Sequence, residues 1–182
     1  MIWMIFMSQS GLTDPSRERA WAAWYAEHLS IMVTVPGITS AQRFTTATPG
    51  HPPSLAMYTV ASAAVFDDPY YRSVRGMGEW QPLIDTRHYH RNLFAGLDVA
   101  PDVSEDGVLI VVDRERPTTL PSLALTWLTA AGLDRSTPYR GIGVVDAATS
   151  DALAQHDLAV YRPSGRRDTA RSRAALSQRV QQ

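Results

Sequence analysis

The apolar and polar positions of the N-terminal half follow two periods, which predict alternating strands and helices. Residues 1–7 are almost wholly apolar, which is typical of a buried strand. Between positions 21 and 32, large apolar and aromatic side chains recur at helical intervals, so they line one face of a helix. We predict this helix over residues 14–33, because Asp14 is a good N-cap and Pro15 suits the first helical position.

Three more strands and a second helical segment are predicted before residue 98. Residues 38–46, 55–61 and 87–97 have strand-like patterns, and residues 63–77 should contain one or two short helices. The resulting order, β-α-β-β-α-β, is that of a ferredoxin-like α+β fold. In this fold two helices cover one face of an antiparallel sheet.

A shorter second cycle is predicted after an acidic loop at residues 98–106. Residues 108–112, 140–145 and 158–162 are strand-like, and residues 117–131 have a helical pattern. This half therefore resembles a degenerate second ferredoxin-like repeat. We divide the chain into a ferredoxin-like domain, a second α+β repeat and a flexible arginine-rich tail: residues 1–98, 107–163 and 164–182.

The composition excludes several kinds of chemistry. The chain has no cysteine, which rules out disulfides, thiolate nucleophiles and thiolate zinc sites. It has no lysine either, and all 17 basic residues are arginine. The absence of lysine excludes Schiff-base catalysis and a Walker P-loop. The net charge of −1 indicates neither nucleic-acid nor membrane partners. The short apolar N-terminus lacks the basic start of a signal peptide, so we expect a cytoplasmic protein.

His28 is the candidate catalytic residue of the first helix. It lies within the apolar and aromatic stripe, where an imidazole can hold or release a proton in a largely dry pocket. The alternative is a structural histidine that fills a gap between helix and sheet. Trp24 and Tyr25 lie on the same stripe, and we expect them to contact a flat or aromatic substrate.

A second cluster of polar side chains lies in residues 87–92. In a strand, His88 and His90 share one face, and Arg87 and Arg91 share the other. We predict that one histidine lies beside His28 as a second proton carrier, and that an arginine holds an anionic group of the substrate. Two alternatives stay open, a metal bound by the two histidines and a solvated edge strand. We expect no metal, because no spacing supplies further ligands.

Two more aromatic residues complete the predicted site. The hydroxyl of Tyr58, in the third strand, could polarise a substrate carbonyl, and Trp80 could line the cavity. His51 lies among prolines in a loop and could flank a pocket mouth. The sequence has no Gly-x-Gly-x-x-Gly fingerprint and no Gly-x-Ser-x-Gly elbow, so we expect no organic cofactor.

The first half of the chain resembles the EthD-like branch of the dimeric α+β barrel superfamily. The resemblance rests on Trp24-Tyr-x-Glu-His-Leu29, the turn Val35-Pro36-Gly37 and the strand segment Gln42-Arg43-Phe44. It implies two ferredoxin-like sheets packed face to face as a barrel, usually by homodimerisation. The second cycle could instead supply the other sheet, although it has no equivalent of the Glu-His-Leu motif.

Three functions are open at this point. The first is a cofactor-independent enzyme that uses histidine acid–base chemistry on a carbonyl or phenol-like substrate, aromatic or polyketide, as an isomerase, cyclase or decarboxylase-like lyase. The second is an oxidoreductase, either a haem-binding protein or a cofactor-free monooxygenase. The third is a non-catalytic ligand-binding or assembly module. We expect a small-molecule substrate and a homodimer.

Overall fold

One antiparallel β-sheet dominates the structure, a computed structural model that describes residues 2–153 and 157–170. The described strands are β1 (Met4–Ser10), β2 (Ile38–Thr45), β3 (Ser54–Val60), β4 (His90–Ala95), β5 (Gly107–Arg114), β6 (Thr126–Leu133), β7 (Tyr139–Asp146), β8 (Ala159–Pro163) and β9 (Asp168–Thr169). Their order is β3-β1-β4-β6-β7-β5-β8-β2-β9, and β2 also pairs with β3. Strands β1 to β8 therefore close into a barrel, and β9 lies against the free part of β2.

The two halves of the barrel have the same strand order. In the first half the order is β4-β1-β3-β2, and in the second half the equivalent order is β8-β5-β7-β6. The halves join where β4 pairs with β6 and where β2 pairs with β8. The barrel therefore closes within a single chain, which answers a question that the sequence pattern left open.

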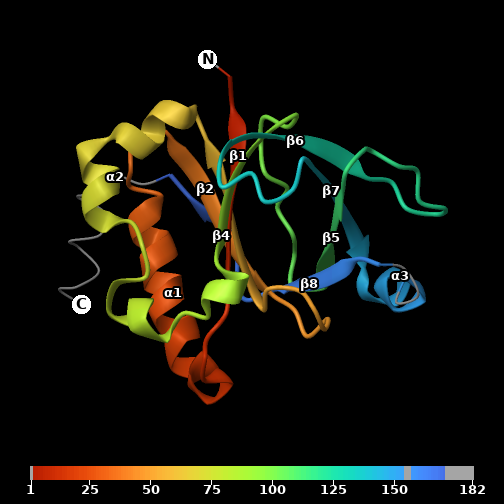
Figure 1. Cartoon of the computed structure of the whole chain (residues 1–182), viewed down its shortest axis with the longest axis horizontal. Helices are drawn as coiled ribbons and strands as arrows, with labels where there is room; N and C mark the ends of the chain where they lie inside the picture. Colours follow the sequence, from red (N-terminus) through yellow and green to blue (C-terminus); the bar gives the residue numbers. More distant parts are fainter. Residues whose placement is uncertain (1, 154–156, 171–182) are drawn as a thin grey trace.

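The first half carries most of the helical structure (Figure 1). Helix α1 (Glu18–Met32), the 3₁₀ turn η2 (Ala63–Asp67) and helix α2 (Pro69–Val74) all cover the outer face of β1–β4. Among the described residues of the second half, α3 (Ala147–Ala152) is the only helix, and it lies on the far side of the barrel. In the part of the chain that the structure describes, no helix is long and apolar enough to cross a bilayer.

The predicted first helix is confirmed, and its apolar stripe explains where it packs. Asp14 accepts a hydrogen bond from the backbone N–H of Ser16 at 3.0 Å and starts a 3₁₀ turn, η1 (Pro15–Arg17), which leads into α1. The residues of α1 buried against the sheet are Trp21, Tyr25, Leu29 and Met32. The two short helical segments predicted around Asp68 and Pro69 are also present, as η2 and α2.

The helix predicted over residues 117–131 is wrong. Residues 115–125 form a loop, and β6 follows, with Leu128 fully buried inside the barrel. The loop lies directly over two glycines of β7. A Cβ atom at Gly143 would lie 2.9 Å from the carbonyl oxygen of Ala124, and one at Gly141 would lie 3.1 Å from Leu125. These glycines let the loop occupy the place of a covering helix.

Two other segments differ from the sequence interpretation. Residues 87–97 are not one strand, because Thr86–His88 form the 3₁₀ turn η4 before β4 begins at His90. The Asp85 carboxylate accepts a hydrogen bond from the backbone N–H of Arg87 at 3.0 Å and stabilises this turn. Residues 168–169, in the predicted tail, form β9, and residues 171–182 lie outside the described residues.

The core has separate layers inside and outside the barrel. The interior is filled by alternate residues of both halves, such as Met7, Phe44, Met57, Leu109 and Tyr161. Outside the first half, a second layer lies between α1 and the sheet, and a third layer lies outside the second half. Both faces of β1–β4 are thus covered, so each face of these strands has its own enclosed environment.

Candidate functional site

Strand β4 divides the predicted cluster of residues 87–92 between two hollows on opposite faces of the sheet. Leu93 packs in the layer beneath α1, whereas Phe94 packs inside the barrel. Successive side chains of a strand point to opposite faces. Arg91 therefore lines a hollow between helix and sheet, and His90 lines a pocket at one end of the barrel.

The first hollow, which we call the helix–sheet hollow, contains His28. Its walls are mostly aromatic and include the four tyrosines Tyr25, Tyr58, Tyr71 and Tyr89. The free space is only about 20 Å³, which is room for about one water molecule. The loop of Arg75, Gly76 and Met77 closes part of it, and the side chain of Met77 is buried.

His28 lies at the edge of this hollow as a half-buried, uncharged imidazole. Its ring stacks on Trp24 with centroids 4.8 Å apart and an interplanar angle of 10°. Burial lowers the pKa of His28 from 6.5 to about 4, so the ring is neutral at pH 7 and able to accept a proton. Within the described residues it has no hydrogen-bond partner, which leaves its nitrogens free for a bound molecule.

Arg91 brings a positive charge to the same hollow. Its Nη2 donates a hydrogen bond of 2.7 Å to the Tyr71 hydroxyl, and its guanidinium carbon lies 5.6 Å from the centre of the Phe6 ring. Among residues 2–153 and 157–170, no carboxylate forms an ion pair with Arg91. A cation without a counter-ion beside an aromatic hollow is a natural binding group for an anion.

The tyrosines of the hollow are hydrogen-bond donors at neutral pH. Burial raises the pKa of Tyr25 to about 12 and also raises the pKa values of Tyr58 and Tyr71. The Tyr58 ring stacks on Phe6, with centroids 5.1 Å apart, at the sheet side of the hollow. These hydroxyl groups stay protonated, so they can orient the oxygen of a bound carbonyl or phenolate.

The structure brings together only some of the residues singled out in the sequence. His28, Tyr25, Tyr58 and Arg91 line the helix–sheet hollow, and Trp24 stacks against His28. Trp80 is buried elsewhere, with the Arg17 guanidinium carbon 4.8 Å from its ring centre. One of the histidines His88 and His90 was predicted to lie beside His28, but both line the other pocket, together with Arg87.

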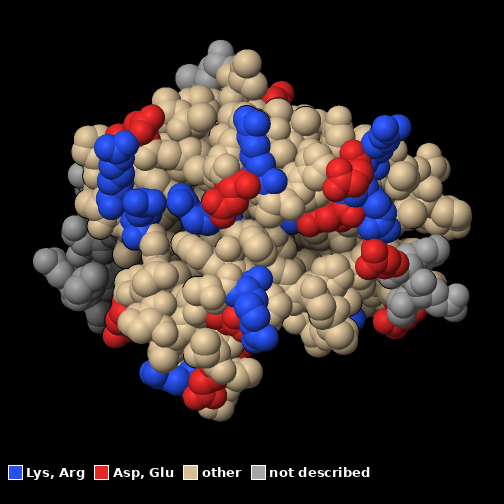
Figure 2. Space-filling view, viewed as in Figure 1, with Lys and Arg blue, Asp and Glu red and all other residues tan. Residues whose placement is uncertain are grey.

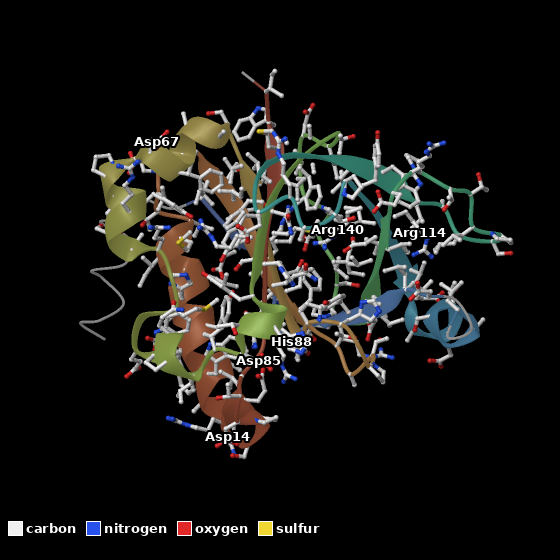
Figure 3. The ribbon with its side chains drawn as sticks, in the orientation of Figure 1. Asp14, Asp67, Asp85, His88, Arg114 and Arg140 are labelled. Atoms are coloured by element: carbon white, nitrogen blue, oxygen red, sulfur yellow. The ribbon has the colours of Figure 1, made fainter. Side chains whose placement is uncertain are left out.

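This second pocket, the barrel-mouth pocket, is larger and polar. Its volume is about 390 Å³, and it is lined by His51, His88, His90 and Arg140 among others. Figure 3 labels His88 on η4 and Arg140 on β7. Arg87 is held at its rim by Asp85, with a distance of 2.7 Å from Nη2 to Oδ2, and this contact lowers the pKa of Asp85 to about 2.

Sequence reasoning missed several groups of this pocket. His51 was noted only as a possible flank of a pocket mouth, and the inward-facing side chains Gln9, Asp113 and Arg140 were not singled out. The sequence did offer a sign for Arg140. It begins the predicted strand at residues 140–145, and in that strand it shares a face with the apolar residue Ile142. No group of three or more potential metal ligands is present among the described residues.

The charged surface gives no further indication of a partner. Figure 2 shows arginines and acidic residues interspersed over the visible face, without a large area of one sign. This pattern is in keeping with the net charge of −1.

Comparison with known proteins establishes the fold. No family model matches the chain, and no curated protein matches it in sequence. A solved structure from Lactobacillus acidophilus NCFM, provisionally assigned as a monooxygenase, superposes with a TM-score of 0.58 at 8% identity, covering 93% of this chain and 97% of the other. A protein provisionally assigned as a chlorite dismutase gives a TM-score of 0.57 at 7% identity, covering 91% and 96%. The chain therefore has the same α+β barrel fold as these two proteins.

Proposed function

We propose that this protein is an oxidoreductase of the cofactor-free monooxygenase type that acts on a phenol-like or enolisable substrate in the helix–sheet hollow. One observation carries the proposal: the guanidinium of Arg91, which has no ion-pair partner among the described residues, and the neutral imidazole of His28 line the same tyrosine-walled hollow. A base and a fixed cation are what the formation of a phenolate or enolate requires. The assignment of one structural neighbour as a monooxygenase supports the same class.

The chemistry begins with proton transfer. Neutral His28 accepts a proton from a phenolic hydroxyl or an acidic C–H of the substrate, and Arg91 holds the resulting anion. The electron-rich anion then reacts with molecular oxygen, which is the second substrate. For an activated CH₂ group the products are a carbonyl and water, so one oxygen atom enters the substrate and the other leaves with the two substrate hydrogens.

Substrate binding requires the hollow to widen. The present space of about 20 Å³ is far below the volume of an aromatic molecule. Residues 75–77 close the hollow, and Gly76 has a φ of +93°, a conformation that glycine adopts readily. We propose that displacement of this loop admits the substrate.

We do not propose haem binding. The hollow has room for about one water molecule, and the imidazole of His28, the histidine that lines it, already stacks on Trp24. A porphyrin would need the aromatic wall itself to be displaced. The described residues of this hollow do not fit that group.

A second candidate shares the first step. If the enolate is protonated again at another position, or forms a new bond, the enzyme is an isomerase, a cyclase or a decarboxylase-like lyase. The low pKa of His28 supports this alternative, because a protonated His28 is a stronger acid than an ordinary imidazolium and returns its proton more readily. Oxygen consumption separates the two candidates.

Finer structural assignments also belong to this proposal. We propose that each half of the barrel is a ferredoxin-like unit, and that the loop at residues 115–125 replaces the first helix of the second unit. We also propose that the chain belongs to the EthD-like branch, on the motif around His28. A homodimer and a cytoplasmic location stay predictions.

The test is an oxygen-electrode assay with anthrone as the probe substrate. We expect one oxygen molecule to be consumed for each quinone formed, and His28→Ala to lower the rate by about 10²–10⁴-fold. Glu27→Gln is the matched control, because Glu27 is the exposed neighbour of His28 on α1. Full activity of His28→Ala would remove His28 from the mechanism. Conversion of the probe without oxygen uptake would favour the second candidate.

A further inference from the structure

The barrel-mouth pocket is a second hollow, open to solvent, on the opposite face of the sheet from His28. Four strands direct polar side chains into it: Gln9 from β1, His90 from β4, Asp113 from β5 and Arg140 from β7. His51 and His88 complete the wall from adjoining loops. The volume of about 390 Å³ lies within the range of small-molecule sites.

Strand register explains why these polar groups gather at one end. Gln9 is paired with His90 across β1 and β4, and Asp113 is paired with Arg140 across β5 and β7. Deeper in the barrel, most inward positions of the same strands are apolar, as at Met7, Phe94 and Leu109, and Asn92 of β4 is a buried polar exception. The polar groups thus form a ring at the open end, above an apolar floor. Barrel mouths of this kind are common ligand sites.

Arg140 supplies a built binding group within this ring. Its side chain is 1% exposed, and its guanidinium donates to Asp113 through Nε at 2.7 Å and through Nη2 at 2.8 Å. Nη2 also donates to Gln9 Oε1 at 2.9 Å, whereas Nη1 has only the sulfur of Met7 at 3.5 Å. A thioether is a weak acceptor. Among the described residues, Nη1 of Arg140 therefore reaches no oxygen acceptor.

The balance of charged groups around the pocket favours an anion. Arg87 forms an ion pair with Asp85, and Arg140 forms one with Asp113. Three of the chain's five histidines also line the pocket, and among the described residues its lining contains no further carboxylate to pair with them. Tyr161 on β8 contacts Gln9 at 3.3 Å, and burial raises its pKa to about 12, so it adds no negative charge. The ring N–H group of each of the three imidazoles can donate a hydrogen bond to an anionic oxygen.

We propose that the barrel-mouth pocket binds a small organic oxyanion, a carboxylate- or phosphate-bearing metabolite, through Arg140 and the histidines His88 and His90. This site is distinct from the helix–sheet hollow, because β1 and β4 separate the two. Its occupation does not depend on the proposed monooxygenase activity. Hydrogen bonds from the Arg140 guanidinium and from the ring N–H groups of the two histidines carry the affinity.

The test is calorimetric titration of the full chain with two probes, succinate and inorganic phosphate, at about pH 7. We expect saturable binding of at least one probe. The better probe identifies the carboxylate or the phosphate source. His88→Gln and His90→Gln should each weaken binding about tenfold, as expected for the loss of one hydrogen bond to a charged group.

Arg114→Gln is the matched control. Arg114 lies at the end of β5 next to Asp113 but does not line the pocket, so its loss should leave binding within about twofold. Circular dichroism of each variant shows that the fold is kept. The proposal is overturned if neither probe binds at millimolar concentration. It is also overturned if the two histidine variants bind as wild type, or if His28→Gln abolishes binding and so moves the anion to the other hollow.

Discussion

The two hollows on either face of β1–β4 differ in almost every physical property. The helix–sheet hollow is small and aromatic, and it contains the neutral imidazole of His28 and the guanidinium of Arg91, which is hydrogen-bonded to Tyr71. The barrel-mouth pocket is larger and polar, and its buried arginine is paired with Asp113. The first environment suits proton transfer in a dry space, whereas the second suits the binding of a charged, hydrated molecule.

This comparison teaches that neighbours in sequence need not serve one site. His90 and Arg91 are adjacent, yet the two-residue period of β4 sends them to opposite faces of the sheet. Conversely, His51 and Arg140 are far apart in sequence and meet at the barrel mouth. The predictions below test how independent the two hollows are.

The largest expected effect is that of Arg91→Gln on catalysis. Removing the cation that holds the substrate anion should lower kcat/KM by about 10²–10³-fold, because the stabilisation of a developing negative charge is lost. Steady-state oxygen uptake measures this loss, and the variant should bind succinate or phosphate like wild type. Equal loss of both functions would show that the two hollows are coupled.

Asp113→Asn tests the barrel-mouth pocket by removing the counter-charge of Arg140. We expect the free energy of unfolding to fall by about 2 kcal/mol, since a nearly buried guanidinium is left unpaired. This loss of unfolding free energy is smaller than for a fully buried ion pair, because the Asp113 side chain is 44% exposed. Urea denaturation measures the loss. Asp157→Asn, which breaks the more exposed ion pair with Arg114, should cost less than about 1 kcal/mol.

The low pKa of His28 predicts a pH dependence of stability. The unfolded histidine takes up a proton near pH 6.5 and the folded one only near pH 4, so the unfolded state binds more protons between these values. Stability should therefore fall as the pH decreases from 6.5 towards 4, by about 1 kcal/mol per pH unit from this residue. Urea denaturation of His28→Gln should show a shallower decrease, and an unchanged slope would contradict the burial of this imidazole.

The smallest expected effect is that of Tyr71→Phe. This change removes the 2.7 Å hydrogen bond that orients the Arg91 guanidinium, a loss of about 1 kcal/mol. We expect kcat/KM for oxygen uptake to fall about fivefold, with little change in the unfolding midpoint. Tyr70→Phe, on the neighbouring position of α2, is the control, because Tyr70 does not line the hollow. If kcat/KM fell more in Tyr70→Phe than in Tyr71→Phe, the effect would come from a general disturbance of α2.

Sequence patterns predicted the first half of the fold well. Helix α1 has an N-cap, a proline start and an apolar stripe that agree with one another, and β2 and β3 have clear boundaries. The same kind of pattern gave a wrong prediction at residues 117–131. There the spacing of the leucines and Trp127 fits a helix as well as it fits a loop followed by a strand. The glycines of β7 that accommodate this loop are distant in sequence, so local periodicity contains no sign of the contact.

The sequence by itself determined which segments are apolar on one side, that His28 shares a face with aromatic residues, and that cysteine and lysine chemistry are excluded. Only the tertiary structure decided that the barrel closes within one chain and that the predicted histidine partners of His28 lie across the sheet. The physical reason is that periodicity fixes the face on which a side chain lies. What occupies the space beside that face depends on which strands pair, through contacts between residues far apart in the chain.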